Sequence, residues 1–162
     1  MKVTGFTIIR NAIKYDYPVV ESIKSILPIC DEFVVAVGES EDETRELVSS
    51  ISANKIKIID TKWDMSLRTG GRVLAEETNK ALNSLSEDTD WGFYIQADEV
   101  MHEQWLPHLM KAMEHYKDDP ITEGLLVNYL HFYGSYDYIG DSRRWYRKEI
   151  RIVKPKAGLS SY

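Results

Sequence analysis

Short β-branched runs alternate with amphipathic helical patterns through the first two thirds of the sequence. The strand-like runs are residues 3–9, 33–37, 55–59 and 91–96, and apolar residues at helical spacing follow each of them. Strands that alternate with helices need crossover connections, which pair the strands in parallel. The order therefore predicts an α/β fold with a mostly parallel central sheet flanked by helices.

Four helices are expected between and after these strands. One begins near Pro18, because the first turn of a helix tolerates proline. Ser40 with Glu43 three residues later matches a capping box, which predicts that the second helix begins there. The other two have apolar faces within residues 73–82 and 105–113. Each helix thus has one face with which to cover the sheet.

The last third of the chain has a different composition. Residues 124–132 have the pattern of one longer strand, and residues 149–153 that of a last strand. Tyr, Trp and Arg are dense between Tyr129 and Arg151. We interpret this part as a specialised edge or loop region, so residues 1–162 are expected to form a single domain.

Composition excludes several classes of protein. The net charge of −6 over 162 residues leaves no basic footprint of the kind that binds nucleic acid. Cys30 is the only cysteine, which rules out an intramolecular disulfide and fits a reducing compartment. The sequence has neither a run of 18 apolar residues nor a signal peptide. No transmembrane segment is therefore expected, and a cytoplasmic location is the default.

Polar clusters follow three of the predicted parallel strands. The carboxyl ends of parallel strands meet at one edge of the sheet, and ligands of open α/β sheets bind at that edge. Asn11 either hydrogen-bonds a base or stabilises a turn, whereas Ser40 and Glu43 are explained as a helix cap. The clusters are Arg10 with Asn11, the acidic run of residues 39–44 that begins with Glu39, and Gln96 with Asp98 and Glu99.

The cluster after the fourth strand carries the most chemistry. Asp98 and Glu99 are adjacent carboxylates, which suit a hard divalent cation that in turn holds a phosphate. A solvated acidic turn is the plainer interpretation. Gly71 and Arg72, before the third helix, offer backbone amides and a cation to a phosphate, or form only a flexible loop.

Four motifs, in this order and spacing, resemble the nucleotide-binding half of family 2 glycosyltransferases, which have the GT-A fold. Residues 10–12 stand where the family has an Asn-Glu pair. Residues 37–44 keep Ser40, Asp42 and Thr44 of the family's D-x-G-S-x-D-x-T turn. They lack its leading aspartate, for which Glu39 is the substitute.

The third and fourth motifs extend the resemblance to the rest of the predicted sheet. Residues 63–66 are similar to the family's Trp and acidic turn, and Thr78 with Asn79 to its Arg-Asn pair, without the arginine. Residues 95–99 are similar to the D-x-D motif, with Gln96 in place of the first acid and Asp98 as the second. The resemblance spans residues 3–154 and implies the GT-A fold.

The resemblance also implies a transfer reaction that uses a nucleoside diphosphate sugar. Asp98 would coordinate a Mg²⁺ or Mn²⁺ ion that bridges the diphosphate of a UDP- or GDP-sugar. Gln96 would accept a hydrogen bond from a metal-bound water, or donate one to the ribose or the diphosphate. The other residues assigned to the donor are Arg10, Asn11, Glu39, Gly71, Arg72 and Asn79.

An inverting transfer to an acceptor hydroxyl also needs a base. Asp141 is the candidate, beside Asp137 and Glu149, and none of the three is singled out by a motif. In the family this carboxylate often lies past the end of a chain of this length, so part of the acceptor-binding region is expected to be missing. The resemblance implies a carbohydrate or lipid-linked acceptor. A lipid or a growing surface polysaccharide in that role would place the protein at the inner face of a membrane.

Two other functions are kept open. A GT-A-like fold that has lost catalysis and serves as a binding or scaffold module would explain the replaced acids, Gln96 among them. A nucleotidyltransferase uses a related sheet and an acidic metal turn. It also needs a glycine-rich, basic phosphate loop after the first strand, and residues 10–14 contain no glycine.

Overall fold

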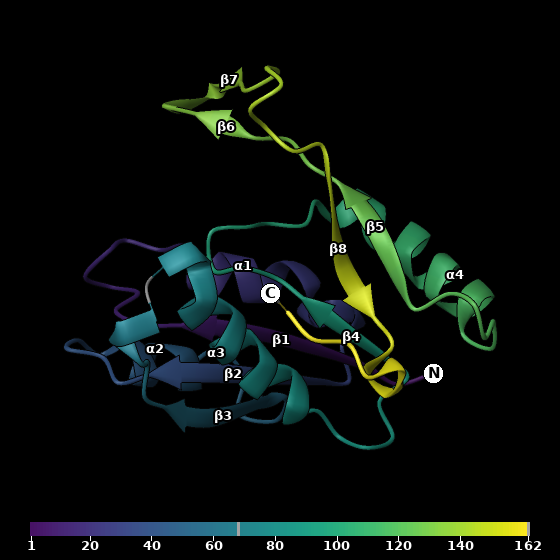
Figure 1. Cartoon of the computed structure of the whole chain (residues 1–162), viewed down its shortest axis with the longest axis horizontal. Helices are drawn as coiled ribbons and strands as arrows, with labels where there is room; N and C mark the ends of the chain where they lie inside the picture. The colour runs from purple at the N-terminus through teal and green to yellow at the C-terminus, as the bar shows by residue number, and fades with distance from the viewer. Residues whose placement is uncertain (68, 162) are drawn as a thin grey trace.

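The computed structural model describes residues 1–67 and 69–161, and its centre is a mixed six-stranded sheet (Figure 1). The strand order is β3-β2-β1-β4-β8-β5. The first four strands pair in parallel, whereas β8 runs antiparallel to both of its neighbours. The strands are β1 (Val3–Ile9), β2 (Glu32–Gly38), β3 (Ile56–Thr61), β4 (Trp91–Tyr94), β5 (Gly124–Asn128) and β8 (Lys148–Val153). The predicted α/β class with a mostly parallel sheet is confirmed.

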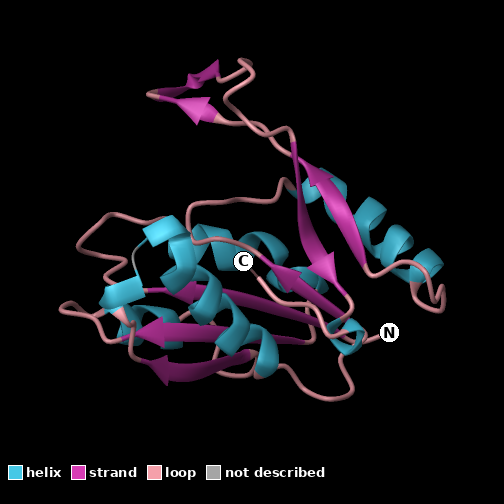
Figure 2. Ribbon diagram, viewed as in Figure 1, coloured by secondary structure: helices cyan, strands magenta, loops and turns pink. Residues whose placement is uncertain are grey.

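Helices cover both faces of this sheet (Figure 2). The apolar core on one face contains side chains of α1, α2 and α4, and the core on the other face contains side chains of α3. Successive residues 33–37 of β2 alternate between these two cores, which explains why this run is apolar without interruption. The helices are α1 (Val19–Ile26), α2 (Thr44–Ser49), α3 (Arg72–Asn83) and α4 (Leu106–Tyr116).

A hairpin arm, residues 129–147, projects from the sheet between β5 and β8 (Figure 1). It contains a separate two-stranded sheet of β6 (Phe132–Tyr133) and β7 (Ser135–Ile139), joined at Gly134, whose φ of 75° suits a tight turn. Both strands are exposed along their whole length. Since β5 is parallel to β4, the arm leaves from the edge where the parallel strands have their carboxyl ends.

Two predictions about element bounds are wrong. Residues 124–132 are not one strand, because β5 ends at Asn128 and the chain then leaves the main sheet for the hairpin arm. The capping box is also wrong, because α2 begins at Thr44 rather than beside Ser40. The Ser40 hydroxyl donates to the Gly38 carbonyl instead of capping the helix.

Candidate functional site

The strand order has one topological switch point. The chain adds β2 and β3 on one side of β1 and then places β4 on the other side, so the connections diverge between β1 and β4. In open α/β sheets a crevice forms outside the carboxyl ends of the strands at such a point. A cavity of about 340 Å³ lies there. Its lining includes the last residues of β1, Tyr94 at the end of β4, and residues 96–98 just after that strand. We call it the switch-point pocket.

Aromatic rings form much of the wall of the switch-point pocket. Tyr15 and Tyr17 come from the loop after β1, Trp63 from the segment after β3, and Tyr94 from the end of β4. The two loop tyrosines are partly exposed and lie edge to face, with 6.3 Å between ring centroids. Burial raises the pKa of Tyr94, so its hydroxyl keeps its proton. Flat apolar walls with a few polar groups are suited to a small-molecule ligand.

Three of the predicted donor-binding residues meet in this pocket: Arg10, Gln96 and Asp98. The Nε of Arg10 donates to the carbonyl of Glu39 at 2.9 Å, which holds the guanidinium between the ends of β1 and β2. Asp98 is exposed and Gln96 half-buried. A cation, an amide and a carboxylate therefore share one rim of the cavity.

A tight turn presents Asp98 at this rim. The amide of Glu99 donates to the carbonyl of Gln96 at 3.0 Å, and the amide of Gln96 donates to Oε2 of Glu99 at 3.0 Å. Ala97 and Asp98 thus occupy the two central positions of a reciprocally bonded turn. The hydroxyl of Ser22, on α1, also donates to the Gln96 carbonyl at 2.8 Å. We call residues 96–99 the acidic turn.

A buried ion pair holds the acidic turn from behind. The Nε of Arg151, on β8, donates to Oε2 of Glu99 at 3.0 Å, and NH2 donates to Oε1 at 2.7 Å. Tyr129 donates its hydroxyl proton to the same carboxylate and accepts from Arg151 Nε at 2.9 Å. Burial alone lowers the pKa of Arg151, but the hydrogen bonds and charge of Glu99 raise it overall. Burial raises the pKa of Tyr129, and the hydrogen bond to Glu99 and the charge of that carboxylate raise it further. Arg151 and Tyr129 therefore both stay protonated.

Sequence reasoning missed Arg151, which is only 7% exposed. The available signal was an arginine between Ile150 and Ile152 in a predicted strand, since a charge at such a position needs a partner. For Glu99, the sequence pattern favoured either a cation site or a solvated acidic turn. The structure shows instead a carboxylate that accepts from the Gln96 amide and pairs with Arg151.

Asn11 is buried and does not line the switch-point pocket. It is 2% exposed, has a φ of 54°, and its Oδ1 accepts from the amide of Glu41 at 2.7 Å. Asn is one of the few residues that tolerate the left-handed region. Of the two roles weighed for Asn11, the structure shows the turn-stabilising one.

Side chains of the acidic run tie the loop after β1 to the loop after β2. The amide of Ala12 donates to Thr44 Oγ1 at 2.7 Å, and the amide of Lys14 donates to Asp42 Oδ2 at 2.8 Å. The amide of Asn11 donates to Ser40 Oγ at 3.0 Å. The three motif residues Ser40, Asp42 and Thr44 therefore bind backbone, and three amides of the loop after β1 are already occupied.

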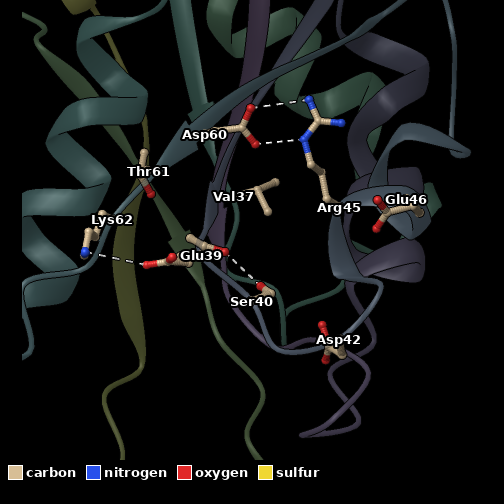
Figure 3. A pocket seen from close by; sticks show the side chains of 10 residues that line it. Val37, Glu39, Ser40, Asp42, Arg45, Glu46, Asp60, Thr61 and Lys62 are labelled. Atoms are coloured by element: carbon tan, nitrogen blue, oxygen red, sulfur yellow. Dashed lines mark hydrogen bonds and ion pairs between the residues drawn. The ribbon is translucent and has the colours of Figure 1, made fainter.

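A second cavity of about 540 Å³ opens at the same edge, between β2, β3 and α2 (Figure 3). Arg45 contacts Asp60 through two bonds, Nε to Oδ1 at 2.8 Å and NH2 to Oδ2 at 3.3 Å. Glu39, exposed, lies 4.0 Å from Lys62 Nζ. We call this cavity the ion-paired pocket, and Glu39 belongs to it rather than to the switch-point pocket.

The remaining predicted donor residues lie outside both cavities. Leu74, in the first turn of α3, lines the switch-point pocket, but Gly71 and Arg72 do not. Gly71 has a φ of 74°, which fits a turn into the helix. Asn79 pairs with the backbone of Ser161, accepting at 2.7 Å and donating at 3.2 Å.

The candidate bases lie away from the cavities as well. Asp141 is exposed in the hairpin arm and forms an ion pair with Arg147 at 3.0 Å. Asp137 is exposed on β7, and Glu149 lies 3.8 Å from Arg151 NH1. None of the three carboxylates lines either pocket.

The donor set limits the kind of metal site that fits. Within residues 1–67 and 69–161, no three His, Cys, Asp or Glu side chains gather as metal ligands. Asp98 offers one exposed carboxylate at the switch-point pocket, and Gln96 adds a neutral amide. Such a set fits a Mg²⁺ or Mn²⁺ ion only where the diphosphate and water supply most of the oxygen ligands.

Solved structures of known proteins share the fold of this chain. No protein-family model matches the sequence, and no curated protein sequence matches it. TarS 1–349 from S. aureus in complex with UDP-GlcNAc is 19% identical with a TM-score of 0.54, covering 72% of this chain and 32% of TarS. A 4-diphosphocytidyl-2C-methyl-D-erythritol synthase from Anaerococcus prevotii is 10% identical with a TM-score of 0.57, covering 96% and 71%.

These comparisons establish the fold. TarS is a GT-A-like glycosyltransferase and the second enzyme is nucleotidyltransferase-like, and the chain described here has the GT-A fold that the sequence motifs predicted. The chain spans about a third of the length of the TarS 1–349 structures. Among the described residues, no helix has both the length and the apolar character needed to cross a membrane.

Proposed function

We propose that the protein is a glycosyltransferase of the nucleoside diphosphate sugar type, with the donor bound in the switch-point pocket. The observation that carries this proposal is the acidic turn, which presents Asp98 and Gln96 at the topological switch point beside Arg10. TarS, which has the same fold, was solved in complex with UDP-GlcNAc, and this supports a UDP-sugar as the donor.

Each pocket residue has a role in this proposal. The aromatic walls pack against the flat and apolar parts of the donor. Arg10 attracts the negatively charged diphosphate, and Asp98 holds a divalent cation that the diphosphate shares. The cation, when bound, neutralises the charge that develops on the departing nucleoside diphosphate. Because Gln96 is neutral, the metal affinity without nucleotide should be weak.

A nucleotidyltransferase is the second candidate, favoured by the near-complete overlap with the A. prevotii enzyme. An enzyme of that class binds a nucleoside triphosphate through free amides of a phosphate loop after the first strand. Here the amides of Asn11, Ala12 and Lys14 donate to Ser40, Thr44 and Asp42. That occupancy supports the glycosyltransferase over the nucleotidyltransferase.

Calorimetric titration with UDP and GDP, each with and without Mn²⁺, tests the proposal. We expect a nucleotide to bind, and we expect Mn²⁺ to strengthen that binding. In Asp98→Ala, the affinity measured with Mn²⁺ should fall to the metal-free level. Asp118→Ala is the matched control, because Asp118 is an exposed aspartate outside both pockets and should change nothing. Absence of binding to either nucleotide would contradict the proposal and favour a scaffold role. Pyrophosphate release from a nucleoside triphosphate and a sugar phosphate would favour the second candidate.

A further inference from the structure

Glu99 is the point where three separate parts of the chain meet. Its carboxylate accepts from Gln96 within the acidic turn, from Arg151 on β8, and from Tyr129 at the start of the hairpin arm. The partners lie 30 and 52 residues along the chain from Glu99, so no local preference of the turn creates the cluster. Glu99 does not line the switch-point pocket, although its neighbours Gln96 and Asp98 do.

We propose that Arg151 and Tyr129 are positioning residues that act through Glu99 to fix the acidic turn, and so set where Asp98 stands at the switch-point pocket. The inference rests on the proposed function in one respect, that Asp98 is the residue that meets the donor.

The geometry of the ion pair supports this role. Both oxygens of Glu99 are engaged by the planar guanidinium of Arg151, and this fork fixes the rotation of the carboxylate as well as its place. Oε2 of the same carboxylate accepts from the Gln96 amide. Any rotation of the carboxylate therefore breaks a bond inside the turn that carries Asp98.

Tyr129 adds a constraint from the arm. It directly follows β5, its amide donates to the carbonyl of Arg147 at 2.9 Å, and its ring lies over the guanidinium of Arg151 at 5.3 Å. These contacts close the base of the hairpin arm against β8. Because the Tyr129 hydroxyl also donates to Glu99, the arm and the acidic turn share one carboxylate. A displacement of the arm is thereby transmitted to the turn.

Two conservative variants remove the constraint without removing the charges. Tyr129→Phe keeps the ring over Arg151 and loses only the hydroxyl. Arg151→Lys keeps the positive charge and loses the planar fork. Tyr116→Phe, at the end of α4 and away from both pockets, is the matched control for the loss of a tyrosine hydroxyl.

Amide hydrogen exchange at Gln96 and Glu99 tests positioning directly and needs no nucleotide. We expect Tyr129→Phe and Arg151→Lys to raise exchange at these two amides about tenfold, because each variant removes hydrogen bonds that oppose local opening of the turn. Exchange in β1 and β2 should stay unchanged, and so should every amide in Tyr116→Phe. Unchanged exchange at Gln96 and Glu99 in both variants would overturn the inference, as would an equal rise throughout the sheet.

Calorimetry with UDP then links positioning to the donor. With Mn²⁺ present, the affinity of both variants for UDP should fall about tenfold below that of the unmodified protein. Without metal, their affinity for UDP should equal that of the unmodified protein. If the unmodified protein binds no nucleotide, the proposed function fails while exchange still decides the positioning role. If it binds and both variants keep the full effect of Mn²⁺, the link to the donor is refuted.

Discussion

The switch-point pocket and the ion-paired pocket open at the same edge of one sheet, and each has a two-bond contact between an arginine and a carboxylate beside it. Arg151 and Glu99 form theirs in the interior, at 9% and 14% side-chain exposure, whereas Arg45 and Asp60 form theirs at 52% and 65%. The buried pair is linked to the turn that carries Asp98. The exposed pair lies within the cavity itself.

Cavity volume and strand order favour different pockets. The ion-paired pocket is the larger, but it lies between β2 and β3, where the strand order has no switch point. The two ion pairs, Arg151 with Glu99 and Arg45 with Asp60, should also contribute differently to the free energy of unfolding. A buried charge depends on its partner, whereas water replaces the partner of an exposed one.

Removing the carboxylate of the buried pair should produce the largest effect. Glu99→Ala removes the carboxylate that engages both arms of the buried Arg151 guanidinium and leaves only the more exposed Glu149, 3.8 Å from NH1, as a counter-charge. We expect the free energy of unfolding to fall by about 3–5 kcal/mol. Urea denaturation followed by far-UV circular dichroism measures this loss. A loss below about 1 kcal/mol, the range of surface pairs, would mean that the two pairs are equivalent.

Crowding the wall between the two pockets should produce an intermediate effect. Gly38 lines the ion-paired pocket, and a Cβ there would overlap the indole of Trp63, which lines the switch-point pocket. We expect Gly38→Ala to reduce the free energy of unfolding by about 1–3 kcal/mol, the cost of overpacking.

A double-mutant cycle separates this contact from other effects of the methyl group. In a Trp63→Leu background the cost of Gly38→Ala should shrink, because the indole that it strikes is gone. An equal cost in both backgrounds would place the strain elsewhere.

Breaking the exposed pair should produce the smallest effect. Arg45→Gln removes both bonds to Asp60, and we expect only a small loss in the free energy of unfolding, because water replaces the partner of an exposed charge. Repeating the urea denaturation at about 1 M salt, where the screening length is about 3 Å, should shrink even this difference. A salt-independent loss as large as that of Glu99→Ala would erase the contrast between the pockets.

The parallel half of the fold was predictable because its signals are local. The apolar runs of β1 and β2 and the helical stripes report burial residue by residue, and β1 has the predicted bounds, Val3–Ile9. The bounds of α2 were not predictable in the same way. The side chains of Ser40 and Asp42 bind amides of Asn11 and Lys14, about 30 residues earlier, so the local capping pattern was overridden by a tertiary contact.

Sequence motifs identified Arg10, Gln96 and Asp98, which meet in one pocket, because all three follow parallel strands. Asn79 and Asp141 were selected by similarity or by residue type, and their partners in the structure are Ser161 and Arg147. The hairpin arm was hidden because Phe132 continues the strand-like pattern of β5 although the chain has already left the main sheet.

Strand β8 lies between β4 and β5 in the sheet although it follows both in the chain. A nascent chain therefore cannot complete this sheet in the order in which it is synthesised. Glu99 emerges 52 residues before Arg151, which corresponds to about 3–10 s at about 5–20 residues per second. During that interval the acidic turn has no guanidinium to fix it. Because Glu99 meets Arg151 only when β8 joins the sheet, we expect the acidic turn to become ordered late in sheet assembly.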